Sequence, residues 1–111
     1  MIKVSVFQDQ AGIQGYEVKG HAGYAEAGQD IVCAGVSAVT HTALLGLEKY
    51  LPNRFQYQIN QGGFMKCELA TGLAPEEFHI AQVILATMLL GLKSIKAEYG
   101  NYIEIALQEV K

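Results

Sequence analysis

The sequence predicts an α+β fold in which a mostly antiparallel sheet packs against two helices in two layers. Five short segments alternate apolar and polar residues with the period of two that is typical of half-buried strands. Two longer segments repeat apolar residues with helical spacing. Short turns join the first two strands and the next two, so each pair is expected to be antiparallel. The expected order is β-β-α-β-β-α-β.

The element boundaries follow from turn and capping residues. Residues 9–12 and 61–63 read as turns that close two hairpins, and Pro75 suits the first residue of a helix that ends before Gly100. With 111 residues, the chain is expected to form a single domain over residues 1–111. The expected strands are residues 2–8, 13–19, 54–60, 64–70 and 102–110, and the expected helices are residues 31–50 and 75–99.

Composition and charge exclude several classes of protein. Half of the residues are apolar, which argues against disorder, and the formal charge of −3 argues against direct nucleic-acid binding. The first seven residues alternate like a strand, so no signal peptide is expected, and two cysteines suggest reduced thiols in the cytoplasm. The apolar run over residues 80–92 is too short to span a membrane, and no membrane partner is expected.

The start of the first helix carries the residues with the most distinctive chemistry. Asp30 suits the N-cap, which makes Cys33 the third helical residue. Free amides and the positive end of the helix dipole favour a thiolate at this place. A nucleophile also needs a base, and His21 lies at the end of the preceding strand. This pattern indicates a nucleophilic thiol, although a lone cysteine is more often a small buried core residue.

Other interpretations of the two cysteines remain open at this stage. Cys67 falls in the apolar set of its strand and is expected in the core. A metal site from His21, Cys33, His41 and Cys67 matches no common zinc spacing, and no metal is expected. A redox-sensing thiol at Cys33 would lack an obvious resolving partner. His41 and His79 read as surface or packing residues.

The segments Gly20-His21, residues 28–34 (Gly-Gln-Asp-Ile-Val-Cys-Ala) and Val36-Ser37-Ala38 resemble the signature of the ribosomal-processing cysteine proteases. This resemblance implies that His21 and Cys33 are catalytic and that Asp30 and Ser37 support the site. The family usually has alanine where this chain has Gly35, a departure that weakens a helix by roughly 1 kcal/mol but removes no chemical group.

The resemblance implies a cysteine endopeptidase without a cofactor, which removes the N-terminal extension of a large-subunit ribosomal protein precursor. The alternative function is a non-catalytic, ribosome-associated binding module in which His21 and Cys33 only pack.

Several details of the site are open from the sequence. Asp30 can orient His21 or only cap the helix, and the amides of Cys33 and Ala34 are candidate oxyanion donors. Residues 22–29 form a loop of small residues that is expected to be mobile, with Tyr24 and Glu26 as candidate substrate contacts. Ser37 lies one helical turn below Cys33, where its hydroxyl can reach the thiol or a substrate carbonyl.

The second helix is apolar on more than one side between residues 78 and 92. Such a helix either packs between the sheet and the first helix or meets another subunit with its outer side. The second arrangement is the one we expect, and the sequence therefore predicts a homodimer.

Overall fold

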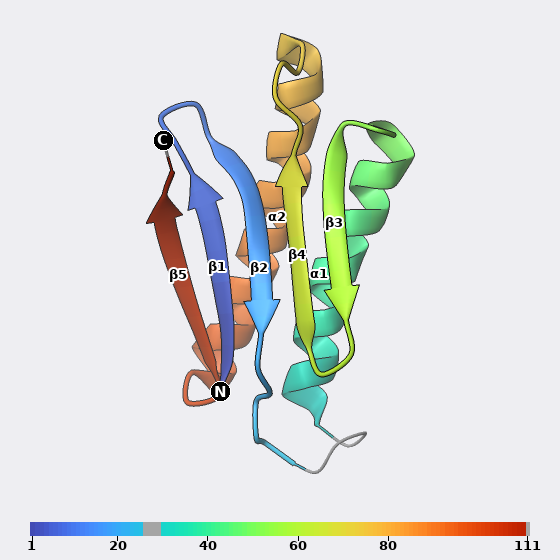
Figure 1. The fold of residues 1–111 in the computed structure, drawn as a ribbon. Coiled ribbons are helices and arrows are strands. Elements are labelled where there is room, and N and C mark those ends of the chain that lie inside the picture. The colour runs from blue at the N-terminus through green and yellow to red at the C-terminus, as the bar shows by residue number, and fades with distance from the viewer. Residues whose placement is uncertain (26–29, 111) are drawn as a thin grey trace.

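The computed structural model describes residues 1–25 and 30–110, and it confirms the predicted fold class and element order. Figure 1 shows one sheet in front of two helices. The expected boundaries agree with the observed ones to within a residue. The strands are β1 (Ile2–Gln8), β2 (Ile13–Lys19), β3 (Phe55–Asn60), β4 (Phe64–Leu69) and β5 (Ile103–Glu109), and the helices are α1 (Ile31–Tyr50) and α2 (Pro75–Tyr99).

The five strands follow the order β3-β4-β2-β1-β5 across the sheet. The β1–β2, β2–β4 and β3–β4 pairs are antiparallel, as expected for a sheet built from hairpins. The β1–β5 pair is parallel. β5 joins the edge beside β1 after the long α2 crossover, a connection that the hairpin pattern does not specify. The sheet is therefore mixed and mostly antiparallel.

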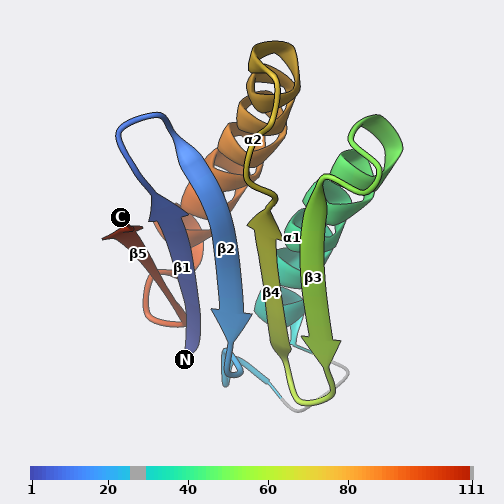
Figure 2. The ribbon, with the colours of Figure 1, turned by 45° about the horizontal axis from the view of Figure 1, so that its top comes forward.

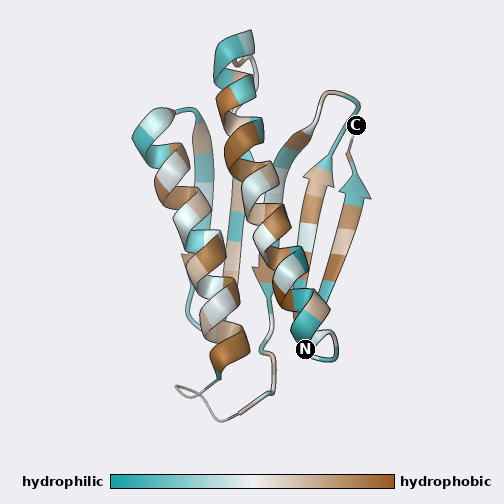
Figure 3. Cartoon of the chain, turned by 180° about the vertical axis from the view of Figure 1, so that it is seen from behind, coloured by the Kyte–Doolittle hydropathy of each residue, from teal (hydrophilic) through white to brown (hydrophobic). Residues whose placement is uncertain are grey.

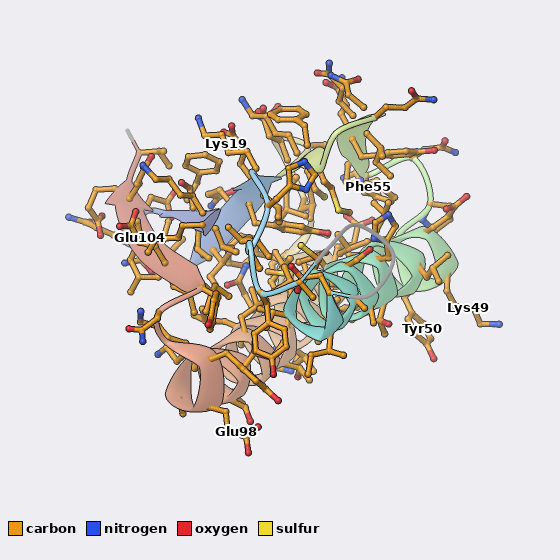
Figure 4. All side chains as sticks on the ribbon, turned by 90° about the horizontal axis from the view of Figure 1, so that it is seen from below. Lys19, Lys49, Tyr50, Phe55, Glu98 and Glu104 are labelled. Atoms are coloured by element: carbon orange, nitrogen blue, oxygen red, sulfur yellow. The ribbon has the colours of Figure 1, made fainter. Side chains whose placement is uncertain are left out.

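Both helices cover the same face of the sheet and lie side by side, as the view from behind in Figure 3 shows. Figure 2 shows α1 behind β3 and β4, and α2 behind the other strands. Seen along the helices in Figure 4, Phe55 of β3 lies on the α1 side and Glu104 of β5 lies on the α2 side. The helix α2 is therefore not sandwiched between the sheet and α1, and residues 1–25 and 30–110 leave part of its apolar surface exposed.

The core lies between the sheet and the two helices. On α1, the expected inward stripe is confirmed for Val32, Val36, Ala43 and Leu47, which are buried. Val39 is only partly buried, and Thr40 takes a core position instead.

Thr40 fits in the core because its hydroxyl donates to the carbonyl of Val36 at 2.8 Å. The buried Tyr16 hydroxyl donates to the carbonyl of Thr40 at 2.8 Å and fixes β2 against α1. Burial, with the nearby Cys67, raises the pKa of Tyr16 well above its usual range, so that the phenol keeps its proton for this bond. This bond helps to fix the position of α1 along β2, and therefore the position of the α1 N-terminus relative to the end of β2.

The two helices approach closely at glycines. A Cβ atom added at Gly91 of α2 would lie 3.2 Å from a methyl carbon of Val39 on α1. Within the described residues, both helices are long and apolar enough to cross a bilayer by length and composition alone. Core helices of soluble proteins pass the same test, and here each helix contributes a buried stripe to the core.

Candidate active site

Asp30 organises the start of α1. Its Oδ1 accepts hydrogen bonds from the backbone amides of Val32 and Cys33, each at 3.0 Å, and its Oδ2 accepts from the amide of Tyr24 at 3.1 Å. Asp30 is buried, which acts to raise its pKa, but hydrogen bonds from the Cys33, Tyr24 and Ala25 amides and from the Cys33 thiol together lower that pKa. Both carboxylate oxygens are thus engaged by backbone amides, and the geometry favours the capping role.

Cys33 and His21 come together at the lower end of α1 and β2. The half-buried Cys33 lies in the first turn of α1, and the exposed His21 follows Gly20, the first residue after β2. The amide of Ala22, the residue after His21, donates to the Cys33 Sγ at 3.3 Å. Both side chains line one open cavity of about 370 Å³. The structure therefore brings the two predicted residues to the same cleft.

The turn between β3 and β4 packs closely against the His21 segment. Gly63 has φ +86, and a Cβ atom there would lie 2.8 Å from the Gly20 carbonyl oxygen and 3.4 Å from Cε1 of the His21 ring. Gly20 itself has φ +89, in the left-handed region that favours glycine. The sequence identified the turn but gave no sign that it contacts the histidine.

The candidate oxyanion donors differ from those that helix geometry suggested. The Cys33 amide already donates to the Asp30 side chain, and the Ala34 amide donates to the Asp30 carbonyl oxygen at 3.0 Å. Both amides already have an acceptor in this structure, which argues against them as oxyanion donors. The amide directed at the sulfur is that of Ala22.

Ser37 lies one turn below Cys33, as expected, and lines both cavities that reach Cys33. Its hydroxyl lies 3.3 Å from Nδ1 of His41, and the same Nδ1 lies 2.8 Å from the Ser37 carbonyl oxygen. The interpretation of His41 as a plain surface residue missed this contact. The i, i+4, i+8 spacing of Cys33, Ser37 and His41 on one helix face was the signal that could have found it.

The loop before α1 has more contacts than its composition suggested. Ala22 is buried, and the Tyr24 ring packs edge-on against Tyr99 and Tyr102, with centroids 5.7 and 5.1 Å apart. Ala22 and Tyr24 therefore anchor the first part of the loop, whereas Gly23 and Ala25 are exposed. Tyr24 is not among the residues that line either cavity at Cys33. Glu26 and the remainder of the expected loop, to residue 29, lie outside the described residues.

Cys67 is much less accessible than Cys33. It is buried on β4, as expected for a core residue, and burial raises the pKa of its thiol to about 12, with a further contribution from Glu68. Cys33 is therefore the accessible thiol of the described chain.

Within residues 1–25 and 30–110, no three side chains of His, Cys, Asp or Glu come close enough to hold a metal ion.

The variant Asp30→Asn tests whether the charge of Asp30 has a catalytic role. Asn keeps the oxygen that caps the helix but presents a donor to the Tyr24 amide in place of the second acceptor, so we expect cleavage activity to fall no more than a few-fold from the wild-type value. A carboxylate that orients a catalytic histidine behaves differently, since its replacement by an amide costs about 10⁴-fold in kcat. Measured kcat values for the two proteins decide between capping and orientation.

The same variant predicts a change in acid stability. The pKa of Asp30 is lowered in the folded chain, so its stabilising contribution is complete above the ordinary value of 3.8 and is lost as pH falls through the lowered value. Asn does not titrate, so the stability difference between wild type and Asp30→Asn should shrink as the pH falls. Urea unfolding followed by circular dichroism across this range measures the difference, and a gap that widens in acid would contradict the assignment.

A thiol at a helix start, beside a histidine in an open cleft, is the arrangement of a thiol-dependent hydrolase. Comparison with known proteins agrees with this class. The sequence matches the family model described as cysteine protease Prp over residues 1–104. The ribosomal processing cysteine protease Prp of Staphylococcus aureus is 37% identical over 109 residues, which cover 95% of this chain and 97% of that protein. That of Bacillus subtilis is 35% identical over 100 residues, or 85% of each chain.

Solved structures give the same result. The Staphylococcus aureus protease Prp in complex with a covalently linked product peptide superposes with a TM-score of 0.85 at 31% identity, covering 97% of this chain and all of that one. Its complex with a substrate peptide gives a TM-score of 0.80 at 30% identity, with the same coverage. The chain belongs to the cysteine protease Prp family, and it is a cysteine protease.

Proposed function

We propose that this protease removes the N-terminal extension from the precursor of a large-subunit ribosomal protein, with Cys33 as the nucleophile and His21 as its base. The observation that carries the proposal is the shared cleft, in which Cys33 and His21 line one cavity and the residue next to His21 contacts the sulfur. Relatives that cover nearly the whole chain are ribosomal processing proteases, and one holds a covalently linked product peptide.

The chemistry follows from the roles of the two side chains. His21 takes the proton of the Cys33 thiol, and the thiolate attacks the carbonyl carbon of the scissile peptide bond. His21 then gives that proton to the leaving amine, and the C–N bond breaks to leave a thioester on Cys33. A water molecule, deprotonated by His21, hydrolyses the thioester and restores the thiol. No cofactor takes part in these steps.

The Ala22 amide is our candidate donor to the oxyanion. It lies 3.3 Å from the Cys33 Sγ, and the carbonyl oxygen of a substrate bonded to that sulfur would lie close to the same amide. A preformed backbone donor stabilises charge that develops only during attack, which lowers the barrier rather than the ground state. The Cys33 and Tyr24 amides donate hydrogen bonds to the Asp30 side chain, and these bonds hold the Ala22 segment and the nucleophile in place relative to each other.

A digestion tests the function directly. Purified protein is mixed with the host's precursor ribosomal protein, and the products are identified by mass spectrometry beside those of a His21→Ala variant. We expect one cut near the N-terminus of the precursor, and a strongly reduced rate for His21→Ala. A folded, alkylatable wild-type protein that leaves the precursor intact would overturn the proposed substrate, and would return the binding-module alternative to consideration.

We also propose that residues 1–111 act as one domain in the cytoplasm, and that two copies associate through the outer faces of α1 and α2. Figure 3 shows apolar bands on the outward surface of both helices. Of the most apolar 18-residue stretch of α2, only 22% is buried by the described residues. An apolar groove of about 550 Å³ runs between the helices, with small residues such as Ala38, Gly46 and Gly91 in its lining. A second copy of the same surface would cover this apolar area.

A charged residue placed in the proposed interface should dissociate the dimer. Leu90 of α2 is 68% exposed, and Leu90→Glu would place a carboxylate in the interface, so we expect the mass in sedimentation equilibrium to fall to that of one chain. Leu107→Glu is the matched control, because Leu107 is 50% exposed but lies on β5 and not on the helices. A wild-type protein that sediments as a monomer at every concentration would refute the dimer.

A further inference from the structure

A second cavity, of about 270 Å³, also reaches Cys33. One wall is the face of α1 that carries Cys33, Ser37 and His41, and the other wall comes from the β3–β4 hairpin, which contributes Ile59 and Phe64. We call this cavity the β3 groove. It begins at the candidate nucleophile and follows α1 away from it, so a peptide held at Cys33 can extend into it.

The inner face of β3 is open along this groove. Tyr57 pairs with Cys67 and Ile59 pairs with Met65, and both partners are buried under the helices. Paired residues point to the same side of a sheet, so Tyr57 and Ile59 also face the helix layer. They are nevertheless 55% and 44% exposed. The helices therefore leave an apolar strip of the edge strand uncovered beside the cysteine.

The length of the groove fits a short extended peptide. His41 lies eight positions after Cys33 on α1, which corresponds to about 12 Å along the helix. An extended chain advances roughly 3.3 Å per residue, so about four substrate residues span this distance. Side chains of such a segment that point toward β3 would cover Ile59, and the apolar surface of this residue favours apolar substrate side chains.

The far end of the groove offers one polar contact. The Ser37 carbonyl oxygen can only accept a hydrogen bond, so Nδ1 of His41, at 2.8 Å, carries the proton of the neutral ring. Nε2 of the neutral ring is then an acceptor for an N–H group of the substrate. A polar group at the end of an apolar groove fixes the position of a peptide that apolar contacts alone would let slide.

We propose that the β3 groove binds the substrate segment on one side of the scissile bond, with apolar side chains packed on Ile59 and a backbone or side-chain N–H bound to His41. This inference rests on the proposed function, because it takes Cys33 as the reacting residue. It assigns specificity to the edge strand β3, which lies outside the segments that carry the candidate catalytic pair.

The test compares two neighbours on one strand. Ile59→Ser removes apolar surface from the groove, whereas Gln58→Ser changes an exposed side chain that points to the opposite face of the sheet. With the N-terminal peptide of the ribosomal protein precursor as substrate, we expect Ile59→Ser to lower kcat/KM about tenfold, mainly through KM, and Gln58→Ser to change it less than twofold. Thermal unfolding of both variants checks that neither has lost its fold.

Shortened peptides provide a further control, because a general disturbance of the protein by Ile59→Ser would affect long and short peptides alike. Peptides shortened by about four residues on one side of the cut no longer reach the groove. For one of the two shortened series, the difference between wild type and Ile59→Ser should therefore disappear, and that series also identifies the side of the scissile bond that the groove binds. An Ile59→Ser effect that persists in both series, or that equals the effect of Gln58→Ser, would overturn the proposal.

Binding separates this inference from the proposed function. A fluorescent form of the same peptide is titrated into Cys33→Ala protein with and without Ile59→Ser, and we expect about tenfold weaker binding with the second change. Weaker binding without any cleavage by the wild-type protein supports the groove and overturns the proposed function. Cleavage with equal binding by both proteins supports the function and overturns the groove.

Discussion

Replacing Cys33 with alanine should abolish cleavage of the precursor, with a loss of at least about 10⁴-fold in kcat/KM. Removal of an enzymatic nucleophile leaves only the catalysis that binding and oxyanion donors supply, which is why such losses are so large. The side chain is half-buried and its sulfur accepts one hydrogen bond, from the Ala22 amide. The fold should therefore survive the change, and circular dichroism should show an unaltered helix content.

Cys67→Ala is the matched control for this result. Cys67 is the other thiol of the chain, but it lies in the core, and burial raises its pKa to about 12. We expect this variant to keep its cleavage rate within about twofold and to lose roughly 1–2 kcal/mol of unfolding free energy through the cavity that it creates. Urea unfolding measures the stability, and the digestion measures the rate.

Alkylation gives an independent readout of the same contrast. In the folded protein, iodoacetamide should add one group per chain, at Cys33, and a second group only in denaturant, because Cys67 is 1% exposed. Activity should fall in parallel with modification of Cys33. Cleavage that survives both alkylation and Cys33→Ala would show that another residue is the nucleophile.

The sequence was sufficient for the parts of the fold that depend on local pattern. Alternation and turn residues predicted each strand to within a residue, and Asp30 marked the start of α1 through the bonds that its side chain makes to Val32 and Cys33. The parallel place of β5 beside β1 could not be predicted in this way, because it depends on how the α2 crossover packs against the sheet.

The candidate site was predictable in its residues but not in its contacts. His21 and Cys33 were both identified, and the structure places them at one cavity. The amide that contacts the sulfur was not identified. The Cys33 amide is bonded to the Asp30 side chain, and it is the Ala22 amide that donates to the thiol. Contacts between segments far apart in the chain, such as Gly63 against His21, have no local signature.

That contact makes Gly63→Ala the second change with a large expected effect. The new methyl group would lie 2.8 Å from the Gly20 carbonyl oxygen and 3.4 Å from Cε1 of His21, so the Gly20–His21 segment has to move. A displacement of about 1 Å in a catalytic group can cost about 100-fold in rate. We expect kcat to fall by about 10- to 100-fold, with a smaller change in KM, because the displaced segment carries His21, whereas Cys33 and Ile59 are not directly altered.

Gly62→Ala separates this effect from backbone strain. Gly62 has φ +90 and Gly63 has φ +86, so an alanine at either position carries a similar left-handed penalty of about 1–2 kcal/mol. A Cβ atom at Gly62, however, has no neighbour within 4 Å among the described residues. The two variants should therefore share the backbone penalty, Gly63→Ala should lose further stability through its clash with Gly20, and only Gly63→Ala should lose activity.

The rate of Cys33 alkylation by iodoacetamide then shows whether His21 is the group that moved. If His21 activates the thiol, its displacement in Gly63→Ala should slow alkylation, whereas Gly62→Ala should react like the wild type. Equal activity and equal alkylation rates in the two variants would mean that the hairpin turn does not position His21. A loss of activity with unchanged alkylation would instead assign the contact to substrate binding, because Gly63 also lines the β3 groove.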